Sequence, residues 1–141
     1  MSNKVVDDPP AEFELLYPDE PFETMVGPHY FAKRDGRLIA GFRAKPSHAN
    51  SGGNVHGGAL SAFADSALTG FALDEIDTLQ FWVATITLNC EYIGRVNVGD
   101  WVECHGAVSK LTRSFAFVRG EMNVADRTVL TCSTVLKKVP R

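Results

Sequence analysis

Several absences narrow what this chain of 141 residues can do. It contains no run of about 20 apolar residues, so the sequence predicts no membrane span. Its net charge is −3, and no basic run and no interleaving of basic with aromatic residues occurs. This charge balance argues against a surface that binds nucleic acid.

Cysteine is also scarce. The three cysteines, Cys90, Cys104 and Cys132, are an odd number, and none has the close spacing of a zinc or redox motif. No apolar signal segment opens the sequence, so we expect reduced thiols and a cytoplasmic location. The histidines outside the central loop are scattered, and we therefore expect no metal site.

The chain has the length of one domain, and 45% of its residues are hydrophobic, which is enough to bury one core. We divide it into an N-terminal acidic segment, residues 1–24, and a main domain, residues 25–141. In the N-terminal segment a short helix is predicted over Ala11–Tyr17, stopped by Pro18. A further helical turn is predicted near Glu20–Val26.

Strand signals dominate the main domain. Residues 29–34 and 37–43 read as a hairpin, because Asp35-Gly36 between them supplies the positive φ that a two-residue turn needs. Four more strands are predicted near residues 81–92, 100–111, 115–124 and 127–137. Strict alternation in the first of these places Trp82 and Tyr92 on one face and Thr85 on the other.

A glycine-rich polar loop that runs into an apolar helix is the most informative feature. The loop ends in His56-Gly57-Gly58, and the large residues that follow, Leu60, Phe63 and Phe71, have the spacing of a helix packed on a core. This helix is predicted to end around Leu73, and it carries one carboxylate, Asp65.

The spacing of these groups has a chemical consequence. At a helix N-terminus the first backbone N–H groups lack partners and the helix dipole favours negative charge, so Gly57 and Gly58 can stabilise an oxyanion. Asp65 lies seven positions beyond Gly58, so it returns to nearly the same helix face as Gly58 but about 10 Å further along the axis at ~1.5 Å per residue. One carbonyl cannot reach both groups, because a catalytic carboxylate must come within about 3 Å. If both act on one substrate, two copies of the chain must share each site, which indicates a homodimer.

The pattern Asn50-x5-His56-Gly57-Gly58-x6-Asp65, followed by Asn89-Cys-Glu-Tyr92 and Val98-Gly99-Asp100, resembles hotdog-fold acyl-CoA thioesterases. The resemblance is to the phenylacetate-degradation and human thioesterase superfamily member 2 type, and it covers roughly residues 25–138. It implies an α+β hotdog fold, in which a curved antiparallel sheet wraps a long central helix. It also implies homodimers that often pair into tetramers, and the hydrolysis of acyl-CoA to free acid and CoA.

The resemblance also implies roles for single residues. Asp65 is the nucleophile or general base, the Gly57 N–H polarises the thioester carbonyl, and Asn50 holds the attacking water. Thr85 matches a family serine or threonine near the site, and His56 lies at the head of the helix and shapes the loop. No organic cofactor is expected, because the thioester is already activated and CoA arrives as part of the substrate. Arg95, Arg113 and Lys110 are candidates for the CoA phosphates by charge and expected exposure alone.

Each of these residues also has a structural interpretation. His56 is favoured as a loop anchor or a helix-start hydrogen bonder, and Asn50 in a Ser/Gly context is a common turn former. Asp65 can be a solvent-facing or paired helix carboxylate. Two other functions also stay open, since a fold does not fix a function: a non-catalytic acyl-CoA-binding hotdog module, and a hotdog dehydratase that acts on a hydroxyacyl thioester.

Overall fold

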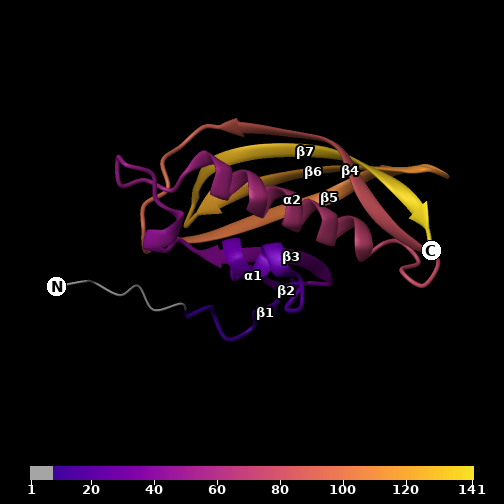
Figure 1. Cartoon of the computed structure of the whole chain (residues 1–141), viewed down its shortest axis with the longest axis horizontal. Coiled ribbons are helices and arrows are strands. Elements are labelled where there is room, and N and C mark those ends of the chain that lie inside the picture. Colours follow the sequence, from indigo (N-terminus) through magenta and orange to yellow (C-terminus); the bar gives the residue numbers. More distant parts are fainter. Residues whose placement is uncertain (1–7) are drawn as a thin grey trace.

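The computed structural model describes residues 8–141, and it has the α+β hotdog architecture that the resemblance implied. The long helix α2 (Gly57–Leu73) lies across the concave face of one curved sheet (Figure 1). The seven strands pair antiparallel in the order β1-β2-β3-β5-β6-β7-β4. Their bounds are β1 Glu14–Leu15, β2 Tyr30–Arg34, β3 Arg37–Arg43, β4 Phe81–Tyr92, β5 Trp101–Leu111, β6 Phe115–Val124 and β7 Arg127–Pro140. Within residues 8–141, no helix has both the length and the apolar character needed to cross a membrane.

Most of the predicted elements are confirmed. The hairpin of β2 and β3 turns at Asp35 and Gly36, which have φ values of 53° and 77°. The four later strands lie where the turn residues between them predicted, and β7 runs three residues further than expected. Helix α2 begins at Gly57 and ends at Leu73, as the apolar spacing predicted.

The core lies between α2 and the concave face of the sheet. Phe63, Ala64 and Leu68 of the helix are fully buried against apolar side chains of the sheet. Two paired glycines of the sheet, Gly106 and Gly120, let the helix approach closely. An added Cβ would lie 2.8 Å from a Phe71 ring carbon at the first and 2.9 Å from a Leu68 methyl carbon at the second.

The predicted helix over Ala11–Tyr17 is wrong. These residues form a turn and the short strand β1, which pairs with β2, and the Leu16 N–H donates to His29 O at 2.8 Å. The apolar residues of this segment serve tertiary packing instead of a helix face, since Phe13 is buried with its ring 4.9 Å from that of Trp101. The helical turn predicted near Glu20–Val26 is confirmed as α1 (Pro21–Val26).

A β-bulge in β4 changes which residues face the helix. Thr85 pairs with Leu136 and Thr87 pairs with Val135 of β7, so Ile86 is an extra residue in the ladder. Such a bulge reverses the alternation of side chains beyond it. The side chains of Thr85, before the bulge, and Tyr92, after it, consequently both contact α2. The assignment of these two residues to opposite faces was therefore wrong.

Candidate active site

Asp65 lies in the middle of α2 and faces the inner surface of β4. The Thr85 hydroxyl donates to Asp65 Oδ1 at 2.8 Å, which orients the carboxylate, and within residues 8–141 the other oxygen accepts no hydrogen bond. The structure therefore brings together two residues that the sequence singled out. Their contact joins the helix to the edge strand of the sheet.

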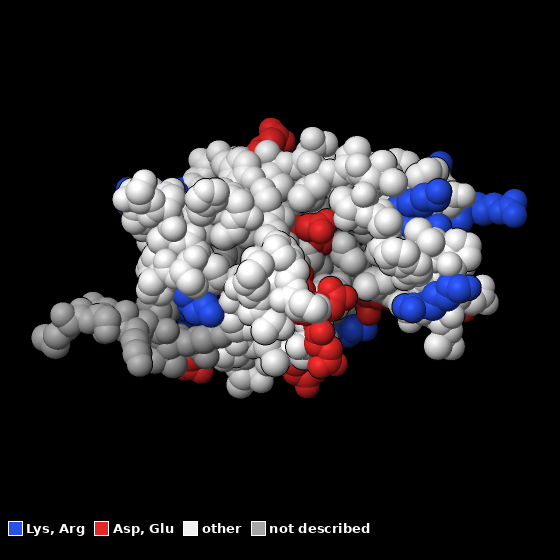
Figure 2. All heavy atoms as spheres, in the orientation of Figure 1, with Lys and Arg blue, Asp and Glu red and all other residues white. Residues whose placement is uncertain are grey.

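A pocket of about 330 Å³ opens beside Asp65. It is bounded by α2, by the start of β4 and by the segment that leads into α1, and its lining includes Tyr17, Thr69, Leu73 and Trp82. Figure 2 shows acidic side chains gathered around a hollow in the middle of this face. Besides Asp65, the carboxylates of Glu20 and Glu23 line the pocket. The carboxylate of Asp65 therefore has space beside it for a substrate group.

At the N-terminus of α2, His56 caps the helix. Its Nδ1 accepts from the Gly58 N–H at 2.8 Å, so its structural interpretation as a helix-start hydrogen bonder is confirmed. An imidazole that accepts at Nδ1 carries its proton at Nε2 when neutral. The Gly58 N–H is thus engaged within the chain, whereas the Gly57 N–H has no acceptor among residues 8–141. The prediction that both glycines offer a free N–H donor is therefore wrong for Gly58, and Gly57 alone of the two keeps this role.

Asn50 organises the loop that precedes the helix. Its Oδ1 accepts from the Gly52 N–H at 2.9 Å and the Asn54 N–H at 3.2 Å, and its backbone N–H donates to Asn54 O. These bonds are those of a turn former, which was one interpretation of this residue. They also fix the orientation of the Asn50 side-chain amide, because its oxygen accepts both hydrogen bonds from the loop. The Nδ2 group has no acceptor within residues 8–141, and it remains a donor for a water or a carbonyl.

The two arginines predicted to meet CoA phosphates lie at opposite ends of the sheet. Arg95 is in the loop before β5 and donates to Asn97 Oδ1 at 3.0 Å, whereas Arg113 is in the turn after β5. Both are exposed. The 11 residues of β5 separate them by about 35 Å at ~3.3 Å per residue, so the two arginines of one chain cannot hold the same phosphate group.

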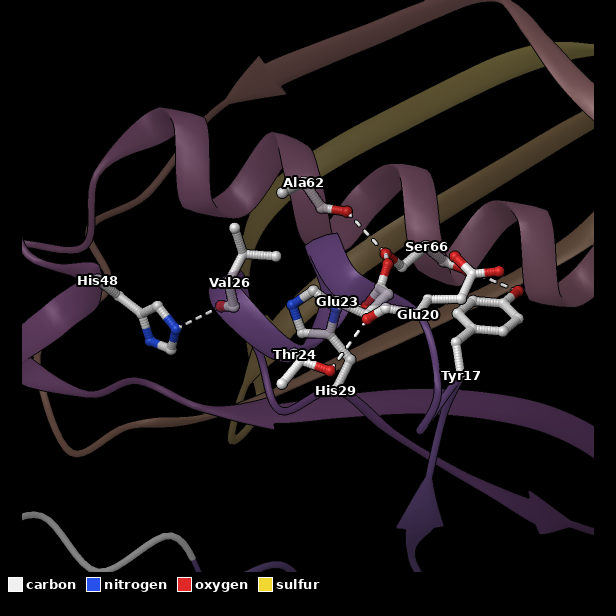
Figure 3. A network of polar contacts seen from close by, with 9 residues as sticks. All are labelled: Tyr17, Glu20, Glu23, Thr24, Val26, His29, His48, Ala62 and Ser66. Atoms are coloured by element: carbon white, nitrogen blue, oxygen red, sulfur yellow. Dashed lines mark hydrogen bonds and ion pairs between the residues drawn. The ribbon is translucent and has the colours of Figure 1, made fainter.

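A buried polar network fastens α1 onto α2 (Figure 3). Glu23 Oε2 lies 2.6 Å from His29 Nδ1, and Glu23 Oε1 accepts from the hydroxyl of Ser66, the neighbour of Asp65. Burial disfavours the charge on Glu23, but the hydrogen bonds from His29 and Ser66 and the charge on His29 outweigh it, so the pKa of Glu23 is lowered. Burial also raises the pKa of Tyr17, whose hydroxyl donates to Ser66 O, and this phenol stays protonated.

This network makes a prediction about stability. Glu23→Gln should lower the free energy of unfolding at pH 7 by about 1–3 kcal/mol, because it removes the negative charge that accepts hydrogen bonds from His29 and Ser66. Since the folded-state pKa of Glu23 is lowered, its stabilisation is present above the unfolded-state pKa and is lost as pH falls through the folded-state pKa. The variant should therefore converge on the wild type in acid.

Urea unfolding of both proteins between pH 7 and pH 3 checks this prediction. Glu20→Gln is the matched control, because Glu20 is exposed and lies just before the same helix. A Glu23→Gln protein whose deficit stays constant over this pH range would show that the ionised carboxylate does not stabilise the fold.

Glu23 and His29 were not predicted as partners, because two residues six positions apart across a helix end have no recognised spacing. Tyr17 was not singled out either, and Tyr92 was given no chemical role. For Tyr92 the sequence did contain a signal, since this tyrosine is the last residue of the Asn89-Cys-Glu-Tyr92 motif. The contact it makes depends on the bulge at Ile86, which the alternation pattern does not reveal.

Comparisons with known proteins agree with this architecture. The sequence profile of the thioesterase superfamily matches residues 52–131, a stretch that includes the helix cap, Asp65 and Thr85. "Putative esterase PA0474" from Pseudomonas aeruginosa is 33% identical over 128 residues, which cover 89% of this chain and 94% of that protein. The chain belongs to the thioesterase superfamily.

Solved structures of low sequence identity share the fold of this thioesterase superfamily member. A phenylacetic acid degradation-related protein from Ralstonia eutropha JMP134 is similar with a TM-score of 0.75 and 19% identity, over 84% of this chain and 90% of that one. The BH2602 protein from Bacillus halodurans, crystallised with CoA, is similar with a TM-score of 0.71 and 19% identity. That match covers 77% of this chain and 72% of the other. The family membership assigns the chain to the hydrolases of esters and thioesters.

Proposed function

We propose that this protein hydrolyses acyl-CoA thioesters to a free acid and CoA, at a site shared between two copies of the chain. The observation that carries the proposal is the Asp65 carboxylate, which Thr85 orients at 2.8 Å beside a pocket of about 330 Å³. A carboxylate held in this way in a member of the thioesterase superfamily has the position and the chemistry of a base or nucleophile.

The reaction follows from the groups at the two ends of the site. The Gly57 N–H, open at the N-terminus of α2, donates to the thioester oxygen as negative charge develops on it. Asp65 then either removes a proton from the attacking water or attacks the carbonyl directly to give a mixed anhydride. The thiolate of CoA leaves in both routes, and in the second route a water then hydrolyses the anhydride, which releases the free acid and restores the Asp65 carboxylate. Asn50, whose Nδ2 is not used by the loop, donates to the water oxygen and holds it in place.

The proposal needs a second copy of the chain, and two features support one. Gly57 and Asp65 belong to the same helix but lie about 12 Å apart along it at ~1.5 Å per residue, which is too far for one carbonyl. Strand β4 is an edge of the sheet, and Trp82, Ile86 and Ile93 in or just after it are exposed apolar residues. A long apolar edge of this kind tends to pair with another strand.

Pairing of two β4 edges around a two-fold axis would extend the sheet and bring the two α2 helices together antiparallel. In that arrangement Gly57 and Asn50 of one copy approach Asp65 of the other. We extend the proposal to a pair of such dimers. We also propose a cytoplasmic location, because the three free cysteines suit a reducing compartment.

The choice of CoA thioesters rests on similarity. BH2602 from Bacillus halodurans, which has the same fold, was crystallised with CoA. The exposed arginines Arg95 and Arg113 would serve different CoA molecules or different parts of one that spans both copies. No metal or organic cofactor enters the proposed reaction, since CoA itself is the activating group of the substrate.

A thiol-release assay over short, medium, long and aromatic acyl-CoAs tests the proposal. Hydrolysis releases free CoA and a carboxylic acid in equal amounts, and we expect this result for at least one class. A dehydratase would release no thiol, and a binding module would bind acyl-CoA without turnover. Either of these two outcomes across the whole panel would overturn the proposal.

A further inference from the structure

Tyr92, the last residue of β4, holds the first turn of α2 from outside the helix. Its hydroxyl donates to Gly57 O at 3.2 Å and also contacts the Ser61 hydroxyl. Its ring lies against Gly57, where an added Cβ would be 3.3 Å from Cε1 of the tyrosine. The residue that carries the open N–H donor is thus fixed by a side chain from another element.

The hydrogen bonds in this cluster have one consistent direction. A phenol has a single hydrogen, and here it goes to Gly57 O, so Ser61 is the donor in its contact with Tyr92. The chain of donors therefore runs from Ser61 through Tyr92 to Gly57. Ser61 and Gly57 are four residues apart on α2, so the phenol clamps one turn of the helix.

The bulge at Ile86 turns the Tyr92 side chain toward α2. Without the extra residue, Thr85 and Tyr92 would face opposite sides of β4, since they are seven positions apart. With it, one strand contacts both chemical groups of the helix, Asp65 through Thr85 and Gly57 through Tyr92. Bulges commonly re-aim side chains next to active sites.

We propose that Tyr92 is a positioning residue for the oxyanion donor, and that Ser61 acts with it. The inference rests on the proposed function, because the Gly57 N–H is the group that would polarise the thioester. Tyr92 bonds to the carbonyl of Gly57 and not to its N–H, so the donor stays open to substrate while its residue is held. A hydrogen bond prefers an angle above about 150° and weakens steeply below about 120°, and a developing oxyanion therefore needs a donor of fixed direction.

Tyr92→Phe tests the inference, because it removes the hydroxyl and keeps the ring. We expect kcat to fall about threefold to tenfold with KM within about twofold, since the lost bond acts on the transition state. Ser61→Ala should lower kcat less. The double variant should be no slower than Tyr92→Phe alone, because both hydroxyls act through one chain of bonds.

Thr131→Val is the matched control. The Thr131 hydroxyl donates to Glu91 Oε1 at 3.2 Å, so this change removes one side-chain hydrogen bond between β7 and β4, next to Tyr92. The bond that is lost does not involve α2. It should leave kcat unchanged. A Tyr92→Phe protein with wild-type kcat, or losses in kcat that multiply in the double variant, would overturn the proposal.

Hydrogen exchange separates this inference from the proposed function. The Ala59 and Leu60 N–H groups donate to His56 O in the clamped turn, and both should exchange several-fold faster in Tyr92→Phe and Ser61→Ala but not in Thr131→Val. If the wild type hydrolyses no acyl-CoA, the proposed function fails, and the exchange rates still decide whether Tyr92 holds the turn. Equal exchange rates in all four proteins would refute the clamp.

Discussion

Asp65→Asn should keep the fold and lower kcat by at least about a hundredfold, the range of general-base catalysis. The amide has nearly the same shape, and its oxygen can still accept from the Thr85 hydroxyl, which now contacts Asp65 Oδ1 at 2.8 Å. What the variant loses is the negative charge that removes a proton or attacks the carbonyl. Steady-state kinetics on the best acyl-CoA, with circular dichroism to check the fold, measures the effect.

Asp74→Asn is the matched control for that variant. Asp74 is the C-cap of the same helix, and its carboxylate forms an exposed ion pair with Lys33 at 3.1 Å. Exposed pairs contribute little to stability, so this change should alter neither kcat nor the fold. Near-normal turnover in a folded Asp65→Asn protein would remove Asp65 from the mechanism.

Gly57→Val should lower kcat by about 10²–10³-fold, the range seen when one oxyanion donor is lost. A Cβ at this position would lie 3.3 Å from the Tyr92 ring, and the two further methyl groups of valine must displace the ring or crowd the N–H. Gly57→Ala should fall between valine and the wild type, because its single methyl group requires the ring to shift only slightly.

Gly70→Ala controls for the loss of a helical glycine. An added Cβ there meets its nearest atom, the Tyr17 hydroxyl oxygen, at 3.4 Å, so alanine fits, and its higher helix propensity should stabilise the fold. The kcat of this variant should equal that of the wild type. If Gly57→Val retained full kcat, the helix N-terminus would not be the oxyanion site.

Local patterns were sufficient to predict most of the fold. Apolar spacing from Leu60 to Phe71 defined α2, and the Asp35-Gly36 pair defined the first hairpin, because both signals depend on residues close together in the sequence. The same rules failed for Ala11–Tyr17. There the apolar side chains pack against distant residues such as Trp101, and tertiary contacts outweighed local helix propensity.

The candidate site was predictable in its motif and not in its geometry. The spacing from Asn50 to Asp65 identified the residues, but the extra residue at Ile86 decides that Thr85 and Tyr92 both reach α2. Likewise, the glycine pair suggested two donors, and only the structure shows that the His56 ring takes the Gly58 N–H. Bulges and caps depend on the register of distant strands and on side-chain rotamers, which the residue spacing does not encode.

The most direct test of a site shared between two chains is complementation of Asn50→Ala by Asp65→Asn. Each variant alone should be nearly inactive, and the two should be refolded together in equal amounts. In a mixed dimer one site collects both lesions and the other collects neither, because a two-fold axis relates the sites. Random mixing makes about half of the dimers mixed, with one intact site in each, so about a quarter of wild-type activity should return. A mixture that contains mixed dimers but shows only the mean activity of the two variants would place each site within a single chain, and would contradict the shared site.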